Sequence, residues 1–146
     1  METIVGINPT IIYYPNGNKQ HELWYINGSR HREDGPAYIW YYETGQVKRE
    51  SWYFNGQYHR ADGAALIEYY KSGIMKEYWF INSKVHRIEG PAITVYHRSS
   101  EIKEELWYLD GKESNHKEWL IDNNLYNKPY NTWTDEEKVL WRLQWV

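Results

Sequence analysis

Three His-Arg pairs recur along the chain, and each stands two residues ahead of an acid. They are His31-Arg32 before Asp34, His59-Arg60 before Asp62, and His86-Arg87 before Glu89. An imidazole can bind a metal ion or move a proton, and a guanidinium can bind a phosphate or a carboxylate. The three sets therefore offer metal-binding, catalytic or anion-binding chemistry, depending on whether the fold brings unlike groups together.

A shared metal site does not fit the spacing of these histidines. Equivalent residues in neighbouring hairpins lie at least two strands apart, which is about 9.5–10 Å. Ligand nitrogens around one zinc ion must lie within about 3.5 Å of each other. We therefore expect no metal site and no cofactor.

Catalysis needs unlike groups that converge on one point, usually at one special position in the chain. Here the same three residue types return three times. The chain shows no isolated serine nucleophile, no glycine-rich phosphate loop and no asymmetric pair of carboxylates. The sequence therefore favours a protein that is not an enzyme.

The His-Arg pairs belong to a longer sequence motif, called the Trp phrase below, that occurs three times. It reads WYINGSRHREDGPA in the first phrase (Trp24–Ala37), WYFNGQYHRADGAA in the second (Trp52–Ala65) and WFINSKVHRIEGPA in the third (Trp79–Ala92). A fourth, decaying copy starts at Trp107, so the tryptophans are separated by 28, 27 and 28 residues. A fixed period of this length is the signature of a repeat architecture.

Every copy contains dipeptides that are typical of hairpin turns. The Trp phrases contain Asn27-Gly28, Asn55-Gly56, Asn82-Ser83 and Asp110-Gly111, and further turns follow the pairs Tyr13-Tyr14, Tyr41-Tyr42 and Tyr69-Tyr70. Asn-Gly and Asp-Gly accept positive φ at both central positions of a hairpin turn. Between turns the residues alternate, so Ala37, Ala65 and Ala92 are candidate core positions. The pattern predicts an all-β fold: an open antiparallel meander of about four hairpin repeats of 27–28 residues.

We divide the chain into a repeat array, residues 1–120, and a C-terminal cap, residues 121–146. The units lie near residues 11–38, 39–66, 67–93 and 94–120. Thr134 and Glu137 form a capping box that opens a helix over about residues 135–145. We expect Leu140, Trp141 and Leu143 to be buried against the final repeat, because the last unit of an array exposes an edge. A docking helix for a partner is the alternative.

The aromatic pair, the Asn-Gly turn, the acid-Gly turn and the Tyr-Tyr pair with its following glycine together resemble the MORN-type repeats, in their variant forms. The resemblance covers about Ile11 to Gly111. It implies an elongated, open antiparallel sheet that serves protein–protein contacts or scaffolding. Similar variant repeats occur in viral and bacterial proteins. The standard MORN unit is shorter and lacks the His-Arg-x-acid-Gly insertion.

Composition limits the partners. The chain has 146 residues, a formal net charge of −3 and no cysteine, and this charge argues against binding duplex nucleic acid. No apolar run reaches the length of about 20 residues that a membrane helix needs. We expect a cytoplasmic protein, in the host cytoplasm if the protein is viral. Nine Trp and 15 Tyr suit half-exposed binding surfaces.

We interpret Asp34, Asp62 and Glu89 as turn acids, and we expect Arg32 and Arg60 to pair with Asp34 and Asp62. The side chains lined up by the repeats would bind another protein, so the protein would act as a binding or scaffold module. The alternative is a small anionic aromatic ligand, such as a nucleotide sequestered in virus–host conflict, and a homo-oligomer stays open. The candidate binding residues are Trp24, His31, Arg32, Trp52, Tyr53, His59, Arg60, Trp79, His86 and Arg87.

Overall fold

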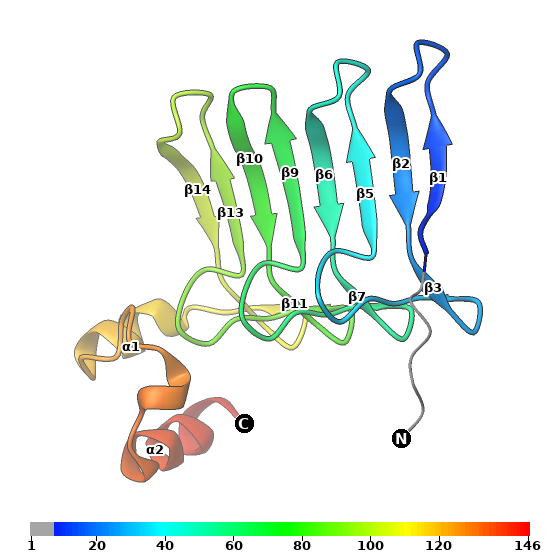
Figure 1. Ribbon diagram of the computed structural model, residues 1–146. Coiled ribbons are helices and arrows are strands. Elements are labelled where there is room, and N and C mark those ends of the chain that lie inside the picture. The colour runs from blue at the N-terminus through cyan, green and yellow to red at the C-terminus, as the bar shows by residue number, and fades with distance from the viewer. Residues whose placement is uncertain (1–7) are drawn as a thin grey trace.

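The computed structural model describes residues 8–146, in which β-strand is the main regular secondary structure (Figure 1). Eight strands form one large antiparallel sheet. They are β1 (Thr10–Tyr13), β2 (Lys19–Leu23), β5 (Tyr38–Tyr41), β6 (Val47–Ser51), β9 (Leu66–Tyr70), β10 (Gly73–Tyr78), β13 (Ile93–Tyr96) and β14 (Ile102–Leu106). Their order across the sheet is β1-β2-β5-β6-β9-β10-β13-β14. Each strand of this sheet after β1 therefore pairs with the sheet strand that precedes it in the chain.

The hairpin turns at the outer end of the sheet are tied to one another. The second tyrosine of each pair starts a turn, in which Gly17 donates its N–H to Tyr14 O and Gly45 donates to Tyr42 O. The hydroxyl of Tyr14 then donates to Tyr41 O at 2.8 Å, and Tyr42 donates to Tyr69 O at the same distance. The first two Tyr-Tyr pairs therefore link the first long hairpin to the second and the second to the third.

The Trp phrases do not join the large sheet, but fold into separate two-stranded pairs. These are β3 (Tyr25–Ile26) with β4 (Ser29–Arg30), β7 (Tyr53–Phe54) with β8 (Gln57–Tyr58), β11 (Phe80–Ile81) with β12 (Lys84–Val85), and β15 (Tyr108–Leu109) with β16 (Lys112–Glu113). Figure 1 shows the labelled short strands crossing beneath one end of the long strands. Their turns have the positive φ angles that the sequence predicts, for example 48° at Asn55 and 78° at Gly56.

Backbone hydrogen bonds connect each short pair to the next one. Arg32 N–H donates to Tyr53 O at 3.2 Å, and Arg60 N–H donates to Phe80 O at 3.3 Å. In the other direction, Gly56 N–H donates to Arg30 O at 2.8 Å. The short pairs therefore form a continuous second layer, in which the main chain satisfies its own polar groups from one phrase to the next.

The corner between the two layers is closed by small residues. Ala37, Ala65 and Ala92 are all 0% exposed, which confirms them as core positions. Behind them runs a row that the sequence did not indicate, in which tyrosine hydroxyls donate to glutamates. Tyr69 donates to Glu50 at 2.6 Å. Burial and the Glu50 carboxylate raise the pKa of Tyr69, so this hydroxyl keeps its proton and the bond.

The C-terminal cap contains α1 (His116–Asp122), the 3₁₀ turn η1 (Tyr130–Thr132) and α2 (Asp135–Trp145). The sequence predicts α2 with its Thr134–Glu137 capping box, and both bonds of that box are present. The helix α1 was not predicted, and it begins inside the range assigned to the fourth repeat. No helix among residues 8–146 is long and apolar enough to cross a membrane.

The cap packs through a core of five buried side chains: Trp107, Leu120, Leu125, Trp133 and Trp141. The expectation for α2 is correct for Trp141, which is 2% exposed, but wrong for Leu140 and Leu143, which are 47% and 81% exposed. The reason is that Trp141 and Trp145 lie one helical turn apart and share the buried face. The equally well spaced pair of Val139 and Leu143 faces outward.

Candidate binding grooves between the Trp phrases

Each recurring arginine lies over the tryptophan of its own phrase. The guanidinium carbon is 4.2 Å from the ring centroid for Arg32 over Trp24 and for Arg60 over Trp52, and 3.9 Å for Arg87 over Trp79. Cation–π contacts of this kind fall well within the roughly 6 Å limit for attraction. The arginine and the tryptophan that starts the phrase therefore form one structural unit.

The acid-Gly dipeptide holds this arginine in place. Arg60 Nε donates to Asp62 Oδ1 at 2.9 Å, and its Nη1 donates to Ala64 O at 3.3 Å. A Cβ built on Gly63 would lie only 2.7 Å from the guanidinium carbon of Arg60. Gly35 and Gly90 are equally crowded by Arg32 and Arg87. A side chain at this glycine would therefore push the guanidinium away from its place over the tryptophan.

We predict that Arg60→Ala lowers the free energy of unfolding by about 1–2 kcal/mol, because it removes the ring contact and the bond to Ala64. Asp62→Asn should cost less than about 0.5 kcal/mol, because the Asp62 side chain is 85% exposed and water screens the ion pair. Urea denaturation of both variants measures the two costs. A larger cost for Asp62→Asn would show that the acid, not the stacked arginine, holds the loop.

The histidines join consecutive phrases. His31 Nδ1 accepts the backbone N–H of Asn55 at 3.0 Å, and His86 Nδ1 accepts that of Asp110 at 3.0 Å. His59 accepts the N–H of Asn82 in the same way, at 3.3 Å. In each case the Nδ1 of one phrase therefore faces the main chain of the next phrase. Burial lowers the pKa of His86.

This arrangement gives the histidines a structural role between phrases. Among residues 8–146, no group of three or more His, Asp or Glu side chains is placed to hold a metal ion. His31 is 5% exposed, and its Nδ1 is already used. The candidate surfaces for binding therefore lie between one Trp phrase and the next, where side chains are more accessible.

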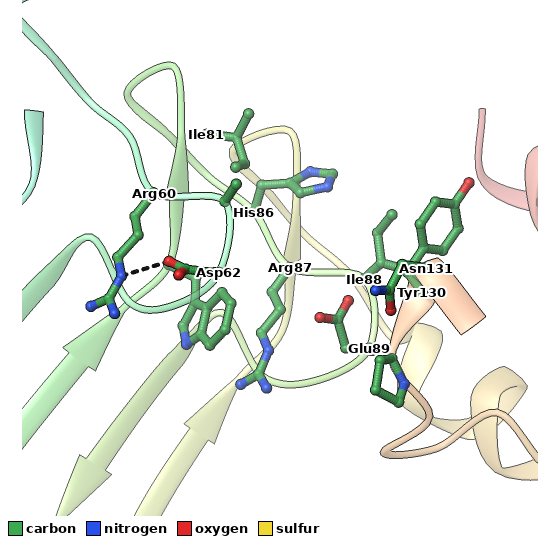
Figure 2. A pocket seen from close by; sticks show the side chains of 12 residues that line it. Arg60, Asp62, Ile81, His86, Arg87, Ile88, Glu89, Tyr130 and Asn131 are labelled. Atoms are coloured by element: carbon green, nitrogen blue, oxygen red, sulfur yellow. Dashed lines mark hydrogen bonds and ion pairs between the residues drawn. The ribbon is translucent and has the colours of Figure 1, made fainter. Parts of the chain in front are cut away.

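Two grooves lie between the phrases. The first groove, a cavity of about 570 Å³, lies between the first and second phrases. The second groove, of about 460 Å³, lies between the second and third phrases (Figure 2). Both volumes fall within the range of roughly 300–1,000 Å³ that is usual for binding sites.

The two grooves are built from equivalent residues. One wall is the Arg-x-acid loop of the earlier phrase, and the other is the Trp, the apolar residue two positions later, and the His-Arg pair of the later phrase. In the first groove these are Arg32, Glu33, Asp34, Trp52, Phe54, His59 and Arg60. In the second groove they are Arg60, Ala61, Asp62, Trp79, Ile81, His86 and Arg87. Pro129, Tyr130 and Asn131 of the cap close the second groove on one side (Figure 2).

The equivalent position after the third phrase is covered by the C-terminal cap, which leaves a hollow of about 440 Å³ beside Ile88, Leu109 and Trp145. Its corresponding residues, Ile88, Trp107 and Leu109, all pack against the hydrophobic core of the C-terminal cap. Trp107 is 7% exposed, whereas Trp52 and Trp79 are half-buried. The chain therefore covers one member of this series of surfaces with its own helical segment and leaves the other two open.

The candidate binding residues divide into two groups. Those that line an open groove are Arg32, Trp52, His59, Arg60, Trp79, His86 and Arg87. Trp24, His31 and Tyr53 are buried and line neither groove. The residue between the His-Arg pair and the acid was overlooked, although Glu33, Ala61 and Ile88 sit at one place in every phrase. Because the residue type at this position differs from phrase to phrase, the sequence alone does not indicate that the position has the same role in each.

Charge differs between the grooves. Arg32 and Arg60 pair with Asp34 and Asp62, and these arginines hold the pKa of the two carboxyl groups below its usual value. Arg87 has no such ion pair with any residue in the described range 8–146, and its Nε is buried without a hydrogen-bond partner. The second groove therefore offers one guanidinium without a direct ion pair, and the carboxylate of Glu89 from the same phrase also lines this groove.

Comparisons with known proteins add no relative: no family model, curated protein or solved structure matches the chain. The function proposed below therefore rests on the contacts described above.

Proposed function

We propose that this chain is a non-enzymatic protein-binding or scaffold module, built as an open meander of four MORN-type repeats, and that it binds a partner in the grooves between the Trp phrases. One observation carries the proposal. The third surface of the same series is formed by Ile88, Trp107 and Leu109. It is already covered by a polypeptide segment, which is the chain's own cap. A surface that packs against protein in one unit is a reasonable site for protein in the next.

The chemistry of the open grooves supports this proposal. Each combines a tryptophan and a second apolar side chain with arginine, histidine and acidic residues at the rim. Trp, Tyr and Arg are the residue types that carry most of the binding energy in protein interfaces. Because the two grooves follow one another along the same layer, one extended partner can engage both, which raises its overall affinity.

Capture of partners by the purified chain tests this function. Ala61 lines both grooves and is exposed, so Ala61→Arg should obstruct them without disturbing the core. Gln57→Arg is the matched control, because it places the same side chain at an exposed position of β8 that lines neither groove. We expect proteins from a lysate of the native source to be retained by the wild-type chain and by Gln57→Arg, and lost by Ala61→Arg. If no protein depends on Ala61, the grooves are not a protein-binding site.

Arg87 supports a second candidate, the binding of a small anionic aromatic ligand such as a nucleotide. Its guanidinium borders the second groove and lacks the ion pair that neutralises Arg32 and Arg60. In that case Trp79 would contact the base and Arg87 a phosphate. A panel of nucleotides should then raise the melting temperature of the wild-type chain but not that of Arg87→Ala. An unchanged melting temperature with every nucleotide would exclude this alternative.

A further inference from the structure

We propose that the second groove binds a short helical segment of the partner that carries tryptophan or tyrosine side chains, in the way that the chain's own cap covers the third phrase. This inference rests on the proposed function, because it specifies the chemistry of the partner for the same site. Three features of the molecule carry it. Aromatic rings of the cap cover the third surface, the second groove has nearly the same wall residues, and Arg87 in the second groove makes no direct ion pair.

The third surface is covered by aromatic rings of the cap, which come from α1, from α2 and from the turn between α1 and η1. His116, the first residue of α1, is 0% exposed and lies beside the backbone of Arg87 and Ile88. Its ring stands edge-on to Trp107, with 4.9 Å between centroids, and edge-on to Trp141 of α2, at 5.3 Å. The ring of Tyr126 stacks on Trp107 at 6.2 Å. Offset and edge-on contacts of this kind stabilise aromatic clusters beyond the burial of their area.

The second groove offers nearly the same surface. Trp79 takes the place of Trp107, Ile81 that of Leu109, and Ala61 that of Ile88. Alanine in place of isoleucine leaves less apolar side chain on the wall of the second groove. The tryptophan and the aliphatic residue two positions after it are kept. The first groove departs further, because Glu33 puts a charge at this position. The second groove is therefore the better match to the surface that the cap covers.

The surroundings of the second groove define its ligand further. Tyr130 borders the groove and also packs against the hydrophobic core of the cap. An aromatic segment bound here would therefore extend an aromatic cluster that already exists. Arg87 makes no direct ion pair inside the described residues, and the carboxylate of Glu89 lies beside it on the side of Tyr130 (Figure 2). A carboxylate next to the aromatic side chain of the partner would complete this site.

A synthetic peptide of residues 116–146, labelled for fluorescence anisotropy, serves as the probe against the full-length chain. It contains the aromatic side chains that cover the third surface and the acids of the capping box. Ala61→Ile should tighten its binding about fivefold or more, because the added carbon atoms restore the wall that Ile88 provides. Ala61→Arg should weaken binding by about tenfold or more, and Gln57→Arg should leave it unchanged. A peptide with alanine at Trp133, Trp141 and Trp145 should not bind.

The outcomes separate this inference from the proposed function. If the peptide binds but is insensitive to both changes at Ala61, it displaces the chain's own cap from the third surface, and the inference is wrong. If the peptide does not bind even to Ala61→Ile, while partner capture still depends on Ala61, the grooves bind protein of another chemistry. If neither the peptide nor any captured protein depends on Ala61, both proposals fail.

Discussion

Replacing Leu120 by alanine should lower the free energy of unfolding by about 2–5 kcal/mol, whereas Leu143→Ala should change it by less than about 0.5 kcal/mol. Both residues are leucines of the cap, but Leu120 in α1 is 0% exposed and Leu143 in α2 is 81% exposed. The first change leaves a cavity among Trp107, Trp133 and Trp141, which cannot all shift to fill it. The second removes atoms that already contact water.

Urea denaturation followed by tryptophan fluorescence measures both costs, since several tryptophans lie in the cap core and report its loss directly. Because the chemical change is identical, the difference between the two variants isolates burial. A cost for Leu143→Ala as large as that for Leu120→Ala would mean that the exposed face of α2 is covered in solution. That result would support the alternative reading of α2 as a docking helix.

The local features of the fold could be predicted from the sequence because their causes are local. The Asn-Gly turns need only two residues that accept positive φ, and the capping box needs only Thr134 and Glu137. The burial of Ala37, Ala65 and Ala92 follows from their fixed place in each phrase. In contrast, α1 begins with no side-chain cap at Asn115. This helix is stabilised by the burial of His116 and Leu120 against residues distant in sequence, so no local sequence pattern predicts it.

The same distinction applies to the candidate site. The pairing of Arg60 with Asp62 spans two residues and was expected, but the bond from Asn82 N–H to His59 Nδ1 spans 23 residues. The grooves lie between phrases, so they depend on how one phrase stacks on the next. Periodicity shows that such a junction exists, but it does not show which side chains face it. The position of Ala61 could be recognised only after Ile88 was seen against the cap.

Acidification should destabilise the chain through His116, by about 3 kcal/mol in all between pH 6.5 and about pH 4. Burial lowers the pKa of His116 from 6.5 to about 4, although the backbone of Ile88 and Arg87 opposes the shift. In this window the unfolded chain binds a proton at His116 and the folded chain does not. The free energy of unfolding therefore falls as the pH falls from about 6.5, and the loss from this group is complete below about pH 4.

Other titrating groups act in the same direction but can be separated. The pKa of His86 is also lowered by burial, so it adds to the loss in the same pH range. Glu137 and Asp62, whose pKa values are lowered by Lys128 and Arg60, stabilise the fold until the pH falls below their ordinary values of 4.5 and 3.8. Above about pH 5.5 the decline therefore reports mainly on buried histidines, because there the carboxyl groups are almost fully ionised in both the folded and the unfolded chain.

Urea denaturation at intervals between pH 7 and pH 4.5 measures this slope. His116→Asn should flatten it, whereas the same change at the exposed His97 should leave it unaltered. Because His116→Asn also disturbs the packing on Trp107 and Trp141, NMR titration of the His116 ring in the wild-type chain provides an independent measurement. A ring that titrates near pH 6.5 would contradict the prediction. It would mean that water reaches the contact between α1 and the third phrase, and that the cap covers this surface less tightly than the buried ring indicates.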